Sequence, residues 1–363
     1  MGRCARLISS GCADDLRATR YPAAATHRSG EPVRAARLHR YGPADVLVID
    51  EVDDSTPGPG ELLVDVAASS VNPVDTKLRK GALRAVMWWK LPHITGLDCC
   101  GTVLAVGEGV SGFSVGDRIF CAPEPKREGV CAERAVLLAS ECALAPTNLS
   151  DVEAASLPLV ALTAYDCLVR SAKVQPGDKV LILGGAGGVG TVAIQMAKAL
   201  GAEVATTASP RNRELVASLG ADHIVDYTQH DPAEVLPPQD VVLIAVGGDG
   251  GKVALRASRK GARLAHIVGD LPVYVERYGV LFGTLAAGLN MARFALVSRL
   301  RGRQGANIVK KPDGEALAQV ARWVESGAIR PVIDSVFPLE QVADAHRAVE
   351  SGKSQGKVVV QLR

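Results

Sequence analysis

Hydrophobic positions along this chain follow two different patterns, and the change falls near Asp151. Between residues 36 and 138 the apolar positions form short runs separated by Gly and Pro turns, with strong strands expected at Glu61–Val71 and 97–106. Many short strands joined by such turns, with little helical periodicity between them, are typical of an all-β, barrel-like domain. We therefore expect such a domain in the first part of the chain.

After Asp151, strand-like runs alternate with stretches of helical periodicity. Helices are expected from Ser150, a typical helix cap, and over 160–170. Strands are expected at or near Val180, Glu203, His223, Val241 and Arg263. This alternation predicts an α/β fold with a doubly wound parallel sheet. The last elements, with strands at 331–337 and 357–362, are expected to return to the first domain.

Residues 179–200 have the pattern of a strand, a glycine turn and a helix. The apolar run 180–183 is followed by Gly185, Gly187 and Gly190 in the order G-x-G-x-x-G. Such glycines permit a tight turn, close approach of the backbone to a pyrophosphate and close packing of helix on strand. Phosphates then bind at the helix N-terminus, which favours negative charge. We predict a dinucleotide site formed by Gly185, Ala186, Gly187, Gly188, Val189 and Gly190; a flexible turn without a ligand is the alternative.

The segment after the second strand of this unit indicates which dinucleotide binds. An NAD site usually has Asp or Glu there, to bond the ribose 2′-hydroxyl. This chain instead has Ser209, Arg211 and Arg213. Arginine can bind a phosphate with two parallel hydrogen bonds, so these residues favour a 2′-phosphate and predict NADPH. The alternative is that both arginines are merely solvated at a helix start.

Length and composition narrow the function classes. A chain of 363 residues is long enough for two domains, and a net charge of +2 argues against a nucleic-acid partner. The eight cysteines include no C-x-x-C pair, which indicates reduced, mostly structural thiols. The uncharged stretch 278–292 has 15 residues and is too short to span a membrane, so we expect no membrane span.

Residues 1–33 differ in composition from the rest of the chain. They contain arginines, serines and alanines but no apolar run, which excludes a secretory signal. The composition is compatible with a transit peptide, although Asp14 and Asp15 count against one, and a disordered extension is the alternative. We expect a cytoplasmic protein, or a mitochondrial or plastid protein if 1–33 is a transit peptide.

Six blocks of the chain carry a family resemblance. They are VNPVDTKLRKG at 71–81, GVSGFSVGDRIF at 109–120, AASLPLVALTAYDCL at 154–168, GGAGGVG at 184–190, LVASLGADHIVDY at 215–227 and IRPVIDSVFPLEQVADAHRAVESGKSQGKVVV at 329–360. These blocks resemble the zinc-independent medium-chain dehydrogenases/reductases. Within this family the chain is similar to the quinone oxidoreductase branch, which includes plastid alkenal/enone reductases and the mitochondrial reticulon-interacting oxidoreductase. The resemblance implies a GroES-like β-barrel catalytic domain at 34–155, completed by about 320–363. It also implies a Rossmann domain at 156–319, with NADPH in the cleft between the two.

The expected chemistry follows from the absence of a zinc ligand. Zinc members of the superfamily carry Gly-His-Glu where this chain has Gly96-Leu97-Asp98, and Leu97 cannot ligate a metal. We therefore expect no metal site. Without a zinc electrophile, the resemblance implies hydride transfer to a quinone or to the C=C bond of an α,β-unsaturated carbonyl. A trans-acting enoyl reductase and a non-catalytic NADPH-binding scaffold are the alternatives, and a homodimer stays open.

The resemblance also implies roles for three residues near the nicotinamide. Asn72 matches an asparagine beside the nicotinamide; capping a turn is its alternative role. Asp75 lies in the same region, where a solvated or structural ion pair is the alternative to catalysis. Thr163 matches a threonine at the nicotinamide, and its alternative is a hydroxyl bonded to its own helix backbone.

Further residues are expected at the ends of the later strands and in one loop. Tyr227 matches a tyrosine at the 2′-phosphate; a partly buried aromatic is the alternative. Val246 and Ile267 end two strands, where cofactor contacts gather in this fold. The loop 82–92 contains Met87, Trp88 and Trp89, which suit a substrate wall, core packing or a subunit contact. Some relatives carry a tyrosine where this loop has Ala82 and Leu83, so the proton donor stays open.

Overall fold

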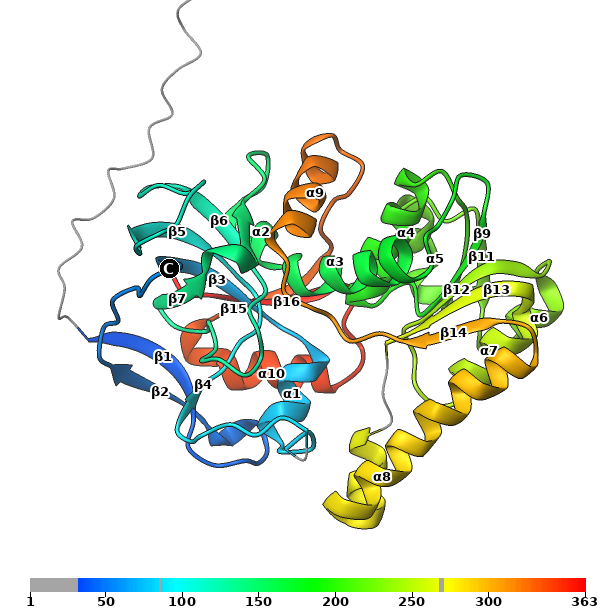
Figure 1. Ribbon diagram of the computed structural model, residues 1–363, viewed down its shortest axis with the longest axis horizontal. Helices are drawn as coiled ribbons and strands as arrows, with labels where there is room; N and C mark the ends of the chain where they lie inside the picture. Colours follow the sequence, from blue (N-terminus) through cyan, green and yellow to red (C-terminus); the bar gives the residue numbers. More distant parts are fainter. Residues whose placement is uncertain (1–31, 85, 268–270) are drawn as a thin grey trace, which may run out of the picture.

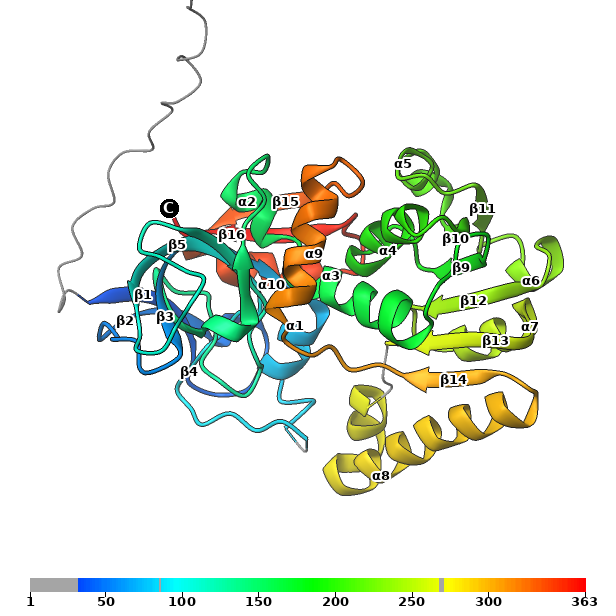
Figure 2. The ribbon, with the colours of Figure 1, turned by 45° about the horizontal axis from the view of Figure 1, so that its top comes forward.

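The computed structural model describes residues 32–84, 86–267 and 271–363, and they form two lobes (Figures 1 and 2). One lobe contains the first strands of the described chain together with its last strands. The other lobe is formed by the residues that lie between these two parts in the sequence. Segments α3 (Pro158–Tyr165) and α9 (Gly314–Glu325) lie where the lobes meet. Most of the predicted segment 1–33 lies outside the described residues.

The first lobe is built from two sheets. A small sheet has the strand order β2 (Leu47–Val52), β1 (Val33–Leu38), β4 (His93–Ile94). The larger sheet has the order β15 (Ile333–Pro338), β16 (Lys357–Gln361), β3 (Glu61–Val71), β5 (Cys99–Val106), β6 (Arg118–Cys121), β8 (Cys142–Leu144), and β7 (Arg134–Leu138) also pairs with β3. Strand β16 runs antiparallel to β3, with Val358 opposite Val71. The C-terminal strand therefore joins the sheet that the first part of the chain began.

Short helices complete this lobe. Helix α1 (Pro73–Arg79) follows β3 directly, and α10 (Val342–Glu350) connects β15 to β16 and lies beside α1. Helix α2 (Asp151–Ala155) begins at Ser150, whose hydroxyl accepts a hydrogen bond from the Glu153 N–H at 3.3 Å, while the Glu153 carboxylate accepts one from the Ser150 N–H at 2.9 Å. This reciprocal capping confirms the predicted helix start.

The second lobe is a six-stranded parallel sheet. Its order is β11 (His223–Asp226), β10 (Glu203–Ala208), β9 (Lys179–Leu183), β12 (Gln239–Ile244), β13 (Ser258–His266), β14 (Gln304–Asn307). The chain order reverses between β9 and β12, which is the switch point of a doubly wound sheet. Helices α4 (Gly188–Ala199), α5 (Arg213–Ser218), α6 (Pro232–Val235) and α7 (Gly250–Ala257) connect the strands. The predicted fold class is confirmed.

Helix α8 (Leu271–Leu300) is the main departure from the predicted elements. The sequence pattern predicts no helix in this region, but the structure has this 30-residue helix, which is interrupted by non-helical geometry at Gly279 (φ 75°). Its part Arg277–Leu300 has the length and composition of a membrane span, and only 11% of an 18-residue apolar window in it is buried. The uncharged stretch 278–292 is thus one part of a longer helix that continues through Arg293, and the helix as a whole could cross a membrane by length and composition only.

The apolar loop 82–92 divides between core and surface. Trp89 is buried and stacks on His93 with ring centroids 4.1 Å apart. Met87 packs against the hydrophobic cluster that contains Trp89. Trp88, by contrast, is 72% exposed. Core packing therefore accounts for two of the three large side chains.

Candidate functional site

The turn between β9 and α4 has the geometry that the glycine pattern predicts, with one shift in roles. Gly184 has a φ of +92°, so the left-handed turn residue lies one position before the motif. A Cβ on Gly190 would lie 2.2 Å from the carbonyl oxygen of Gly184, and a Cβ on Gly185 would lie 2.1 Å from Oγ1 of Thr206. Side chains at both positions are therefore excluded by close packing of helix and strands.

Thr207 holds this turn against β10. The Gly184 N–H donates to the Thr207 hydroxyl at 2.9 Å, and the Gly185 N–H donates to the Thr207 carbonyl at 3.1 Å. Gly187 caps α4 in an extended conformation, and a Cβ there would meet nothing closer than 3.6 Å. The backbone at Gly187 is thus open to a ligand at the start of a 12-residue helix.

A cavity of about 790 Å³ lies beside this turn, at the carboxyl ends of β9, β10, β11 and β12. The predicted site residues that line it are Ala186, Gly187, Ser209, Arg211, Tyr227 and Val246. The lining does not include the other predicted cofactor residues, which are Gly185, Gly188, Val189, Gly190, Arg213 and Ile267. Ile267 instead packs against the core of the second lobe, and Arg213 is exposed on α5.

The end of β10 forms the part of this cavity where the sequence predicts arginines that bind a 2′-phosphate. The strand ends at Ala208, and Ser209 and Arg211 follow on the cavity wall. The Arg211 guanidinium donates to the carbonyl of Lys353 at 3.1 Å, and Gln355 donates to Asn212 at 2.7 Å. Tyr227 is 61% exposed, so it is not the partly buried aromatic of the alternative reading. The segment before β16 therefore closes one side of the cavity.

Asp98 is the centre of a buried polar network at the junction of the two lobes. Its Oδ2 accepts hydrogen bonds from the Ser70 hydroxyl and the Asn72 amide, each at 2.7 Å, and its Oδ1 accepts one from the Leu159 N–H at 2.6 Å. Lys357 lies 3.2 Å from the same carboxylate and also donates to the Asn72 side-chain oxygen. These bonds tie β3, α1, β5, α3 and β16 together.

Lys357 connects this network to the glycine turn. Its side chain is 6% exposed, and a Cβ on Gly188 would lie 3.0 Å from its Cδ. Next to it, the Gly356 N–H donates to the Ala186 carbonyl at 3.0 Å. A buried cation thus lies directly beside the start of α4.

The predicted catalytic residues are buried and bonded to the protein itself. The Asn72 amide is held by Asp98 and Lys357, and the Asn72 N–H donates to Asp75 at 2.7 Å. Burial raises the pKa of Asp75 to about 7, the Asn72 bond and Lys357 lower it, and nearby Asp98 raises it. Asp75 is therefore not a solvated ion pair. The Thr163 hydroxyl donates to the Leu159 carbonyl at 2.7 Å, as its structural alternative predicted.

Metal-binding side chains do not cluster in the part of the chain that the structure describes. No group of three or more His, Cys, Asp or Glu there could hold a metal ion. Leu97, at the position of the zinc ligand in zinc members, is buried. The described cysteines are free and buried, and burial raises the pKa of Cys131 to about 12.

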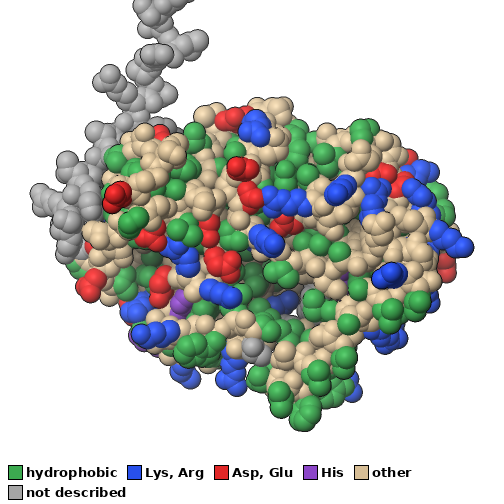
Figure 3. Space-filling model, in the orientation of Figure 1, with side chains coloured by type: hydrophobic (Ala, Val, Ile, Leu, Met, Phe, Trp, Pro, Cys, Tyr) green, Lys and Arg blue, Asp and Glu red, His purple; other side chains and the backbone are tan. Residues whose placement is uncertain are grey.

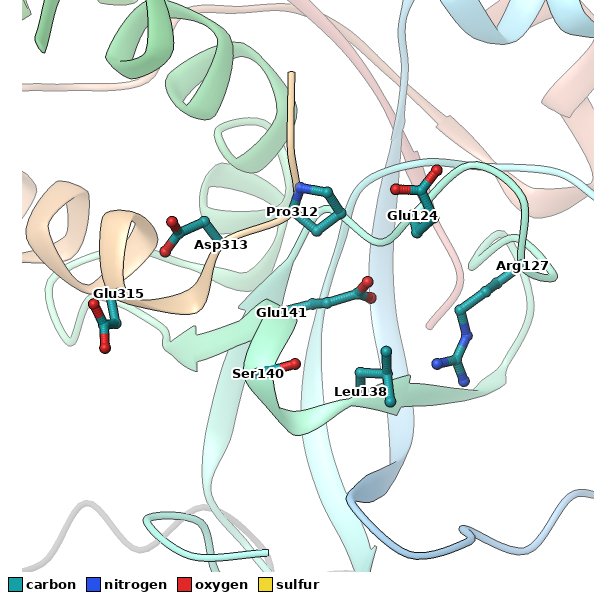
Figure 4. A pocket seen from close by; sticks show the side chains of 8 residues that line it. All are labelled: Glu124, Arg127, Leu138, Ser140, Glu141, Pro312, Asp313 and Glu315. Carbon is teal, nitrogen blue, oxygen red and sulfur yellow. The ribbon is translucent and has the colours of Figure 1, made fainter. Parts of the chain in front are cut away.

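A second cavity, of about 500 Å³, lies where strands of the first lobe meet the start of α9 (Figure 4). Its lining comes from residues 124–127, 138–141 and 312–315 and includes Glu124, Arg127 and Glu141. Burial raises the pKa of Glu141. None of the predicted site residues lines this cavity, so the cavity beside the glycine turn is the candidate site.

Several residues of the site were not predicted from the sequence, and four of them shape the turn or the network beneath it. Gly184 and Thr207 shape the turn, and Asp98 and Lys357 form the network beneath it. Asp98 had been considered only as part of a lost zinc motif. The sequence did contain one signal for this network: Lys357 directly precedes the apolar run 358–360. A lysine beside buried strand residues is expected to have a partner of opposite charge.

Comparisons with known proteins agree with this architecture. Residues 58–149 match the alcohol dehydrogenase GroES-like domain, residues 219–360 match the zinc-binding dehydrogenase domain, and residues 166–257 match the alanine dehydrogenase/PNT C-terminal domain. The second description names zinc, although the described residues lack a candidate metal cluster.

Three known proteins illustrate the similarity. The mitochondrial NAD(P)H oxidoreductase RTN4IP1 of Danio rerio is 34% identical over 350 residues, which cover 90% of each chain. The chloroplastic NADPH-dependent alkenal/one oxidoreductase of Arabidopsis thaliana is 32% identical over 336 residues, or 88% of this chain and 77% of that protein. The quinone oxidoreductase structure from Coxiella burnetii has a TM-score of 0.79 at 28% identity, and covers 92% of this chain and 100% of its own.

Proposed function

The chain belongs to the medium-chain dehydrogenase/reductase superfamily, and from that premise we propose that it is an NADPH-dependent oxidoreductase that works without a metal ion. Its proposed substrate is a quinone or the C=C bond of an α,β-unsaturated carbonyl. The observation that carries this proposal is the cavity that joins Gly187, at the start of α4, to Ser209 and Arg211 at the end of β10. The oxidoreductase names of the relatives support it.

We assign the two lobes to the two parts of the reaction. Residues 34–155 with about 320–363 are the proposed catalytic domain, because β15 and β16 share a sheet with β3. Residues 156–319 are the proposed cofactor domain, because its parallel sheet holds the glycine turn. The polar network around Asp98 lies at the junction, where it fixes the position of one domain against the other.

The residues of the cavity fit a dinucleotide. The open backbone at Gly187 and the N-terminus of α4 suit a pyrophosphate, and the buried Lys357 adds positive charge beside them. Ser209, Arg211, Arg213 and Tyr227 are proposed to hold the 2′-phosphate, with Arg213 reaching the site from α5. When bound, the reduced nicotinamide supplies the hydride. Val246 is also proposed to contact the cofactor, because it lines the cavity.

Asn72, Asp75 and Thr163 are the proposed residues on the catalytic side. Asp98 and Lys357 hold the Asn72 amide in one orientation, which suits a group that positions a substrate or cofactor. The Thr163 hydroxyl keeps free lone pairs while it donates to Leu159, so it can accept a hydrogen bond without leaving its helix. With no zinc electrophile among these residues, an acceptor that already spreads negative charge is the substrate class that fits.

An NADPH oxidation assay tests the proposal. The purified chain would be offered a panel of quinones, enones and enoyl thioesters, with NADPH or NADH and with or without a chelator. We expect turnover with NADPH and a quinone or enone, unchanged by the chelator. NADPH binding without any turnover would instead support the scaffold alternative, and turnover of enoyl thioesters alone would support the trans-acting reductase.

We further propose an organelle as the location of this protein. The relatives named above include a mitochondrial and a chloroplastic protein, and the composition of residues 1–33 is compatible with a transit peptide. A fluorescent protein fused after residue 33 should accumulate in mitochondria or plastids. A diffuse cytosolic signal would contradict this location.

A further inference from the structure

The outer face of α8 is an exposed apolar surface of the second lobe. It consists of Leu281, Phe282, Leu285, Leu289, Leu296 and Leu300, which are between 58% and 76% exposed. Apart from the neighbouring pair 281 and 282, these positions recur at spacings of three, four or seven residues, so they share one side of the helix. In Figure 3, hydrophobic side chains cover the projecting lower part of the molecule, where Figure 1 places α8.

The opposite side of α8 is attached to the body of the second lobe. Ala287 and Ser298 are buried, and the Phe294 ring lies 5.3 Å from the ring of His266, on β13. Helix α8 also packs along β14, where a Cβ on Gly305 would lie 2.5 Å from the Ser298 hydroxyl. The helix is therefore docked on the sheet, and its leucines are exposed because they point away from the lobe.

Positive charge accompanies this apolar face. Residues 277–312 contain Arg277, Arg293, Arg299, Arg301 and Arg303 but no Asp or Glu. Arg293, Arg299 and Arg301 are exposed, and Arg277 lies 5.5 Å from the ring centroid of Tyr278. Tyr278 stacks in turn on Tyr274. Exposed leucines on one face of a helix that also carries exposed arginines are the pattern of helices that lie in a membrane interface.

We propose that the outer face of α8 docks this protein on an anionic phospholipid membrane. The leucines would enter the boundary between headgroups and acyl chains, and the arginines would meet lipid phosphates. A second copy of this chain fits less well, because a two-fold contact would place the same arginine-rich face against itself. A membrane-spanning role for α8 also fits less well, because the helix would have to detach from β14 in order to cross the bilayer. This inference goes beyond the proposed reaction and does not depend on it.

Vesicle cosedimentation with the full chain tests the proposal. Vesicles would be phosphatidylcholine alone or phosphatidylcholine with about one-third phosphatidylglycerol. We expect clear binding to the anionic vesicles, and a fall of about tenfold or more in the partition coefficient for the double variant Leu285→Asp/Leu289→Asp. The variant Arg293→Gln/Arg299→Gln should lose preference for anionic over neutral vesicles. Residues 1–31 are identical in all variants, so their arginines cannot produce these differences.

Val115→Asp is the matched control. Val115 is 61% exposed in the first lobe, and this variant should bind vesicles like the wild type. Circular dichroism melting would show that each variant is folded. Wild-type binding by the double leucine variant, or no vesicle binding by the wild type, would overturn the proposal. A dimer in sedimentation velocity that the leucine variant dissociates, without vesicle binding, would assign the face to a second copy and also overturn it.

Discussion

Replacing Gly187 with aspartate should separate cofactor affinity from the stability of the empty protein. Gly187 caps α4 with φ −79° and ψ 168°, which any residue can adopt, and the nearest atom to an added Cβ is 3.6 Å away. Gly188 is less suitable, because a Cβ there would lie 3.0 Å from Lys357 and 3.2 Å from Val160. A change at 187 therefore alters the cavity without disturbing the packing between the lobes.

The two expected effects of this variant have opposite signs. Aspartate is a better helix cap than glycine by a few tenths of a kcal/mol, and a carboxylate at a helix N-terminus contributes about 0.3–1 kcal/mol more. The apo protein should therefore melt about 1–3 °C higher. Against a bound phosphate, two unit charges about 5 Å apart at an effective dielectric constant of about 20 repel by about 3 kcal/mol. NADPH affinity should fall by about two orders of magnitude.

Differential scanning fluorimetry of the apo protein and an NADPH fluorescence titration measure these effects. Gly187→Ala is the matched control, because it adds the same Cβ without the charge and should lose much less affinity. If Gly187→Asp bound NADPH as tightly as the wild type while remaining folded, the turn would not be the phosphate site. A large loss of apo stability would instead show that the space at Gly187 is not open.

Three further predictions concern single interactions of the site. Replacing Arg211 and Arg213 with alanine should weaken NADPH binding about tenfold or more and leave NADH binding unchanged, and equal losses for both cofactors in titrations would refute the 2′-phosphate assignment. Because the pKa of Asp75 is about 7 when folded and about 4 when unfolded, the folded protein keeps a proton that the unfolded chain loses, and the contribution of Asp75 to stability falls as pH rises between these values. The melting temperature of Asp75→Asn should therefore rise relative to that of the wild type as the pH increases from about 5 to about 8. A difference between the two melting temperatures that does not change with pH would contradict this. Lys357→Met should destabilise by about 3–5 kcal/mol in urea unfolding because it leaves Asp98 buried without its cation, and adding Asp98→Asn should restore part of the loss; no recovery would show that Lys357 acts through packing alone.

Local sequence was enough to predict the glycine turn and most strands of the second lobe, but not α8. The apolar run 180–183, the glycines after it and the helical periodicity beyond them are all set within about 20 residues, so β9, the turn and α4 follow from neighbouring side chains. Alternation of strands and helices then predicted the parallel sheet, because neighbouring parallel strands need a crossover connection, which is usually a helix. Which residues of the cavity bind a cofactor stays a prediction.

Contacts between distant residues were decided only by the tertiary structure. Asp98 and Lys357 are 259 positions apart, and no local pattern shows that β16 brings them together beside β3. Their pairing follows from burial, since each charge loses its water and needs the other. The same holds for α8: its sequence shows apolar residues, but only its docking on β14 determines which of them are buried and which form the exposed face. Periodicity records which residues share a side of an element, whereas the neighbours of that side are set by how the whole chain packs.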